Sequence, residues 1–159
     1  MTPEALAEAL RLLLPHTEIV LGDKPGRVVV KMAPNPKPLT IYIALSKSGL
    51  CAEVSAIDPA QRPRDARFQP PVMVDWIVRR IVEQVDAHTT PDPRKWHQDP
   101  AIEPRIRAWA HLPDVLPMIR PKVDALLAAD RAALAKLRKE VTLHEEDIAA
   151  LERALGVTP

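Results

Sequence analysis

The sequence predicts an α+β fold, with an N-terminal helix, a four-stranded antiparallel meander and then helices, the last of them long. Apolar residues recur at helical spacing near both ends of the chain, whereas the stretch between them is rich in β-branched residues. The connections between the extended segments are short, and short connections favour antiparallel neighbours. We therefore expect one sheet that is backed on one face by helices.

The first helix has a clear start and a clear end. Thr2 and Pro3 suit the N-cap and the first helical position, and Pro15 stops the helix. The apolar residues that recur between them are Leu6, Leu10, Leu13 and Leu14. Their spacing predicts one apolar face.

Four extended segments follow, at residues 17–21, 27–32, 39–45 and 50–57. Residues 22–26 and 46–49 contain the glycine, proline, aspartate and serine that are typical of turns. Residues 33–38 include three prolines, which cannot donate backbone hydrogen bonds, so we expect an exposed elbow there.

The second half of the chain is predicted to be helical. Residues 72–88 carry one apolar stripe, formed by Val74, Ile77, Val78, Ile81, Val82 and Val85. Residues 101–111 are expected to form a short helix with Ile102, Ile106 and Trp109 inward. Prolines 113, 117 and 121 punctuate the next stretch, and a helix then runs from Pro121 almost to Leu155.

We expect two parts, an α+β core at residues 1–112 and a helical extension at residues 113–159 that packs on the core or on a partner. The extension carries a stripe with alternating three- and four-residue spacings, formed by Leu134, Leu137, Val141, Ile148, Leu151 and Leu155, in which Asp130 and His144 fill two further positions. Three heptads are short for an independent coiled coil, which favours packing or partner binding over self-association. Alternatively, Thr142 with Glu145 forms a capping box that breaks the helix into a hairpin.

Composition excludes several classes of function. Lys and Arg number 22 against 21 Asp and Glu, so net charge does not attract nucleic acid or membrane. Three Trp, one Tyr and one Phe are few for a base-stacking surface. The apolar runs are too short to span a bilayer, and a single cysteine favours the cytoplasm, so no membrane partner is expected.

Two clusters of polar residues are weak candidates for binding sites. His88, Asp92 and His97 lie close in sequence but lack the spacing of a zinc site, so no metal is expected. A loop at residues 58–71 carries three arginines, Arg62, Arg64 and Arg67. A solvated loop face explains them more simply than a nucleic-acid site, so nucleic acid is an unlikely partner.

Cys51 is the only cysteine, and it lies where the meander is expected to end and a proline-rich loop to begin. The order of features around it resembles the ubiquitin-conjugating enzymes, in a divergent, bacterial-type form. Residues 34–38 resemble the family's proline-rich elbow, and Gly49-Leu50-Cys51 resembles its cysteine segment, one residue shorter. Residues 68–71 open a helix that ends in a Pro/Asp-rich break at residues 90–93, as in the family, and the match runs from about residue 3 to about residue 112.

The resemblance implies that Cys51 carries a ubiquitin-like C-terminus as a thioester and passes it to an acceptor amine. The implied partners are a ubiquitin-like protein and an adenylating activating enzyme, and no cofactor is implied. The family's His-Pro-Asn triplet would fall near residues 43–45 and is absent. A backbone N–H or the hydroxyl of Ser46 or Ser48 would then stabilise the oxyanion, and Lys47 would favour the thiolate.

Cys51 also fits a second role, because free cysteines are often small buried fillers. In that case the chain is a non-catalytic adaptor of the same fold, which binds protein through the meander and the C-terminal helix. A nucleic-acid-binding accessory protein, which would use the arginine loop, is the third interpretation.

Overall fold

The computed structural model describes residues 1–34, 38–56, 73–91 and 100–156, and it confirms the predicted α+β class. The elements are α1 (Pro3–Leu13), β1 (Glu18–Leu21), β2 (Arg27–Ala33), β3 (Leu39–Leu45), β4 (Ala52–Ser55), α2 (Val74–Thr89), α3 (Ile102–Trp109) and α4 (Leu116–Leu155). The chain divides into two compact units, Met1–Arg120 and Pro121–Pro159, and the division falls within α4.

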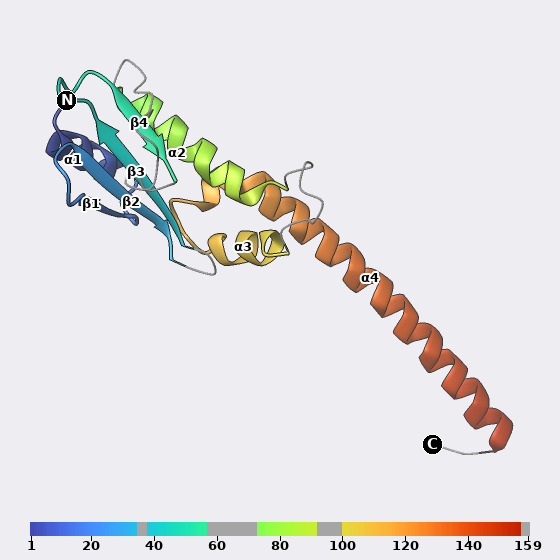
Figure 1. Cartoon of the computed structure of the whole chain (residues 1–159). Coiled ribbons are helices and arrows are strands. Elements are labelled where there is room, and N and C mark those ends of the chain that lie inside the picture. Colours follow the sequence, from blue (N-terminus) through green and yellow to red (C-terminus); the bar gives the residue numbers. More distant parts are fainter. Residues whose placement is uncertain (35–37, 57–72, 92–99, 157–159) are drawn as a thin grey trace. The chain divides into compact units, whose positions relative to one another are not determined.

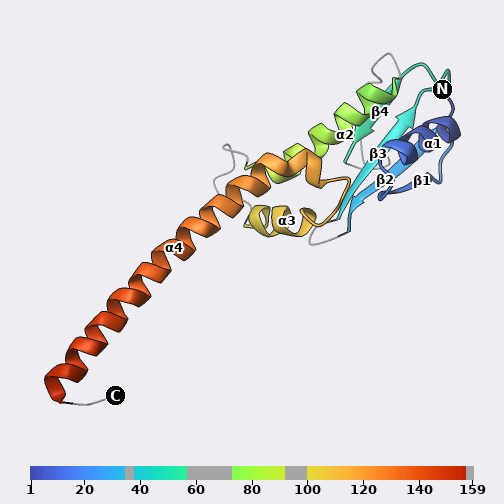
Figure 2. The same cartoon turned by 180° about the vertical axis from the view of Figure 1, so that it is seen from behind.

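The four strands form one antiparallel sheet in the order β1-β2-β3-β4. Its register aligns apolar side chains in rows, because Val28 lies opposite Ile43 and Ile43 lies opposite Val54. Helices α1 and α2 cover the same face of this sheet (Figures 1 and 2). The largest fully buried side chains of this unit are Leu6, Leu10, Val28, Val30, Ile41, Ile43, Ile77, Ile81, Val85, Trp109, Val115 and Ile119. Burial of each such side chain contributes about 1.5–3 kcal/mol, so these side chains form the core of the first unit.

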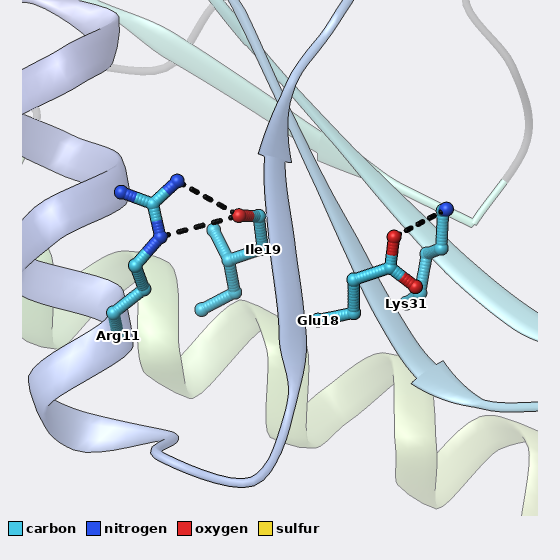
Figure 3. A network of polar contacts seen from close by, with 4 residues as sticks. All are labelled: Arg11, Glu18, Ile19 and Lys31. Carbon is cyan, nitrogen blue, oxygen red and sulfur yellow. Dashed lines mark hydrogen bonds and ion pairs between the residues drawn. The ribbon is translucent and has the colours of Figure 1, made fainter.

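Helix α1 begins as predicted, because the Thr2 hydroxyl accepts a hydrogen bond from the Ala5 N–H at 3.2 Å. Its inward face differs by one position from the prediction, since Ala7 is buried and Leu13 is half-exposed. The Arg11 guanidinium donates two hydrogen bonds, of 3.2 and 2.9 Å, to the Ile19 carbonyl (Figure 3). This contact joins the end of α1 to β1.

The outer face of the sheet is more polar. Lys31 on β2 lies opposite Glu18 on β1, and their side chains form an ion pair at 2.6 Å (Figure 3). Both side chains are at least half exposed, so water screens the pair and its contribution to stability is small.

Helix α4 begins earlier than predicted, at Leu116 rather than Pro121. Pro117 lies in the first turn, where a backbone N–H has no intrahelical acceptor, so proline is tolerated there. Pro121 lies inside the helix and forfeits one hydrogen bond without ending it. The predicted alternative of a hairpin at Thr142 is wrong, because the Thr142 hydroxyl donates to the Arg138 carbonyl at 3.1 Å within an unbroken helix.

Candidate functional site

The turn between β3 and β4 brings together all four residues that the sequence suggested for a thioester site. Ser46 and Cys51 close the turn, since the Ser46 N–H donates to the Cys51 carbonyl at 2.8 Å. The Gly49 N–H donates to the Ser46 carbonyl at 2.9 Å, and Gly49 has a positive φ of 67°. Glycine adopts this left-handed conformation without the steric cost that a Cβ imposes.

The serine hydroxyls in this turn are engaged with the turn itself. The Ser46 hydroxyl accepts the Cys51 N–H at 3.1 Å and lies 3.1 Å from the Ser48 hydroxyl. The Ser48 hydroxyl accepts the Leu50 N–H at 3.4 Å. The Ser46 hydroxyl, which was one of the groups expected to stabilise an oxyanion, is therefore already hydrogen-bonded to a backbone N–H of the turn.

Cys51 is half-buried, and it immediately precedes β4. The sequence placed it just after the turn at residues 46–49, at the start of the last extended segment, and the structure has it between that turn and β4. In the order implied by the resemblance, the cysteine follows the meander. In the structure, Cys51 precedes the last strand of the sheet.

A shallow hollow of about 450 Å³ lies beside this turn. Ser46, Lys47 and Ser48 line it together with the first residues of the chain, and Lys47 is exposed. Cys51 is not among the residues that line it. The Met1 ammonium donates to the Gly49 carbonyl at 3.1 Å, so the N-terminus occupies one side of the turn (Figure 1).

Several other candidate residues lie outside the described residues, namely Asp92, His97, Arg62, Arg64 and Arg67. His88 is described, and its Nδ1 lies 2.7 Å from the Gln84 carbonyl of the preceding turn. Within the described ranges, no group of three or more His, Cys, Asp and Glu side chains is arranged to hold a metal ion.

Two polar residues that the sequence did not single out, Asp114 and Arg105, join separate segments of the first unit by hydrogen bonds. The Asp114 carboxylate accepts the His16 N–H at 2.8 Å and the Thr17 hydroxyl at 2.7 Å, so it joins the segment before α4 to the segment before β1. The Arg105 guanidinium is buried, donates to the His88 carbonyl near the end of α2, and lies 5.9 Å from the centre of the Trp109 ring. Asp114 bonds to residues almost a hundred positions earlier, and Arg105 bonds to the end of another helix, so no local pattern marks these hydrogen bonds.

The second unit presents a different surface. The large apolar side chains of α4 that are exposed are Leu127, Leu134, Leu137, Val141, Leu143, Ile148, Leu151 and Leu155. All except Leu143 lie on the stripe with alternating three- and four-residue spacings, which Leu127 extends by one heptad. We call these seven residues, together with Asp130 and His144, the α4 stripe.

No protein-family model, no curated protein and no solved structure matches this chain. Over the ranges that the structure describes, no helix is both long enough and apolar enough to cross a membrane.

Proposed function

We propose that this protein is a non-catalytic adaptor that binds protein through the α4 stripe. The observation that carries the proposal is the exposure of aliphatic side chains along one line of a 40-residue helix, for example Leu137 at 57% and Leu151 at 63%. A contiguous exposed apolar patch of this kind is typical of an interaction surface.

The arrangement of the stripe supports a helical partner. Apolar side chains that alternate at three- and four-residue spacings form a narrow line, which matches the seam between two packed helices. Most of the other residues along this part of the helix are charged residues or alanine, so burial of the stripe against another helix leaves the charged side chains in water. An adaptor of this kind needs no reactive group, and a half-buried Cys51 is compatible with that role.

The adaptor proposal is tested by co-purification of the tagged full-length chain from its own source cells. The test variant carries Leu137→Ser and Ile148→Ser on the stripe, and the matched control carries Leu143→Ser, which is as exposed but lies off the stripe. We expect the stripe variant to lose its bound proteins while Leu143→Ser and Cys51→Ala keep them. Retention of the same proteins by the stripe variant, with α4 still helical by circular dichroism, would refute the proposal.

The second candidate function is the conjugating-enzyme activity that the resemblance implies, with Cys51 as the thioester-forming nucleophile. The observation that favours it is the partial exposure of the Cys51 side chain in a turn beside a hollow. A thiolate is both a good nucleophile and a good leaving group, as a transient carrier requires. A ubiquitin-like protein and an adenylating enzyme would be its partners, and both candidate functions fit a cytoplasmic protein.

Intact mass under non-reducing conditions tests the second candidate, after co-expression with the proteins encoded beside it. A ubiquitin-like adduct that thiol reductant removes, and that Cys51→Ala abolishes, would establish the carrier. If the co-expressed proteins are folded and active and no adduct forms, the adaptor is the remaining function. We rank the adaptor first because the hydroxyls around Cys51 serve the turn and because Cys51 precedes the last strand.

A further inference from the structure

The charges of α4 are separated along its length. Residues 121–139 contain five basic and two acidic side chains, a net charge of +3. Residues 140–155 contain five acidic and one basic side chain, a net charge of −4. The described helix is continuous across both halves.

This separation does not stabilise the isolated helix. A helix macrodipole is positive at the N-terminal end and negative at the C-terminal end, so it favours acidic residues early and basic residues late. The two halves of this helix have the opposite order. The charge pattern therefore needs an explanation outside the single helix, and two such helices side by side and antiparallel would place each basic half against an acidic half.

We propose that the α4 stripe binds the α4 stripe of a second copy of this chain, in an antiparallel coiled coil. The inference rests on the proposed function, because it identifies the partner of the same protein-binding surface. The stripe fits one heptad register over four heptads, in which Leu127, Leu134, Val141, Ile148 and Leu155 occupy position a and Asp130, Leu137, His144 and Leu151 occupy position d.

The residues that flank the seam determine the orientation. Position e is occupied in turn by Arg131, Arg138, Glu145 and Glu152. In an antiparallel pair, e positions face e positions, so Arg131 meets the partner's Glu152 and Arg138 meets the partner's Glu145. The two-fold symmetry repeats each contact, which gives four attractive pairs.

The parallel alternative is disfavoured by the same side chains. Parallel coiled coils place position g of one helix beside position e of the other. Glu140 would then face the partner's Glu145, and Asp147 would face the partner's Glu152, so four repulsive contacts and no attractive one would form. The antiparallel pair has one unfavourable contact, Glu140 with the partner's Asp147, repeated by symmetry. Lys136 offsets it, since its ammonium lies 3.8 Å from the Glu140 carboxylate.

The same register sorts the core layers. Leu134 packs on the partner's Leu151, Leu137 packs on the partner's Ile148, and Val141 packs on His144 of the partner subunit. Asp130 meets the partner's Leu155 at each end of the overlap, where its carboxylate reaches water. In a parallel pair, Asp130 and His144 would each lie beside the same residue of the partner. In the antiparallel pair, each lies beside an aliphatic residue of the partner.

Sedimentation equilibrium of the full chain at low salt tests the proposal. The first variant carries Arg131→Glu and Arg138→Glu, which makes all four e positions acidic, and the second carries Glu145→Arg and Glu152→Arg, which makes them basic. We expect the wild type to dimerise, each variant alone to dimerise at least tenfold more weakly, and an equimolar mixture of the two to recover the wild-type affinity. The matched control reverses charges off the seam, with Lys139→Glu and Glu146→Arg, and we expect it to dimerise as the wild type does.

Orientation is measured by spin labels on cysteines placed at Ala132 or Lys139, in a Cys51→Ser background. In the antiparallel register, the two labels at position 132 are offset by about 30 Å along the axis and those at 139 by about 10 Å, because a helix rises about 1.5 Å per residue. A parallel pair gives equal distances at the two positions and would overturn the proposed orientation.

A wild-type chain that stays monomeric at about 100 μM, with α4 helical by circular dichroism, would overturn self-pairing, as would a mixture of the two variants that stays monomeric. Such a result leaves the adaptor proposal intact, since that proposal fails only if the Leu137→Ser, Ile148→Ser variant keeps its bound proteins. A dimer that the off-seam control weakens as much as the seam variants would also contradict the proposed contacts.

Discussion

Replacement of Asp114 by alanine should destabilise the first unit by about 2 kcal/mol. The carboxylate accepts two hydrogen bonds, from the His16 N–H at 2.8 Å and from the Thr17 hydroxyl at 2.7 Å. A hydrogen bond to a charged group contributes about 1.5–3 kcal/mol when it is buried and less when water competes. Asp114 is half-buried, so about 1 kcal/mol for each bond is the appropriate estimate.

Two further variants divide this loss between the two bonds. Thr17→Val keeps the shape of the side chain and removes one donor, so it should cost about 1 kcal/mol. The double variant Thr17→Val, Asp114→Ala should cost little more than Asp114→Ala alone, because the same bond is removed only once. The coupling energy of this double-mutant cycle is therefore expected to be about 1 kcal/mol.

Urea unfolding followed by circular dichroism measures these losses. With a slope of about 2 kcal/mol per M, the midpoint for Asp114→Ala should fall by about 1 M. Glu8→Ala removes a carboxylate from the exposed side of α1 and should shift the midpoint little. If Asp114→Ala costs less than about 0.5 kcal/mol, or if the coupling with Thr17→Val is zero, Asp114 does not hold the two segments together as described.

Three other substitutions test the packing of the first unit, each by urea unfolding. Arg105→Met keeps an unbranched side chain but removes the hydrogen bond to the His88 carbonyl and the contact with Trp109. It should lower the free energy of unfolding by about 2–3 kcal/mol. No loss would mean that the buried guanidinium does not stabilise the first unit. Gly49→Ala adds a Cβ at a residue with a φ of 67°, and this Cβ would overlap the Met1 backbone. It should therefore lower the free energy of unfolding more than Gly26→Ala, whose Cβ would lie 3.1 Å from the Leu45 carbonyl oxygen. Equal losses of stability would leave only the left-handed backbone conformation, which both glycines share, to explain them. Ile119→Ala truncates a fully buried side chain and should lower the free energy of unfolding by about 2–5 kcal/mol. The control Leu12→Ala truncates a side chain that is 80% exposed and should cost under about 0.5 kcal/mol. Similar losses for the two variants would place Ile119 outside the core.

The elements with strong local signals were predictable from the sequence. The Thr2 cap, the strand at residues 39–45 and the stripe of α2 each depend on neighbours within a few residues, and the structure has them where they were expected. The buried face of α2 is narrower than the predicted stripe. Ile77, Ile81 and Val85 are buried in the core, whereas Val74, Val78 and Val82 lie beside them and are only half-buried.

The features that the sequence could not show depend on partners far along the chain. Asp114 acquires its role from residues almost a hundred positions earlier, and Arg105 acquires its role from the end of α2. An arginine in an amphipathic helix normally predicts a solvent-facing position, whereas the buried Arg105 donates to the His88 carbonyl and lies over the Trp109 ring. The start of α4 was misplaced for a related reason, since Val115 and Ile119 are buried and their packing holds a helical turn that Pro117 and Pro121 alone would weaken.

The turn that contains Cys51 has a structural explanation that does not depend on the family resemblance. The glycine-led segment was predicted to be a turn between two extended segments, and in the structure it is a hairpin turn, in which Gly49 supplies the left-handed conformation and Ser46 supplies the hydroxyl that accepts the Cys51 N–H. Both residues therefore have a structural reason to be there that requires no reaction. The α4 stripe has no such reason within its own unit, because burial of its leucines and the reversed order of its charges are favourable only when another helix is present. The turn at Cys51 is stable by its own hydrogen bonds, whereas the α4 stripe becomes favourable only when another helix covers it. This difference favours protein binding over thioester transfer.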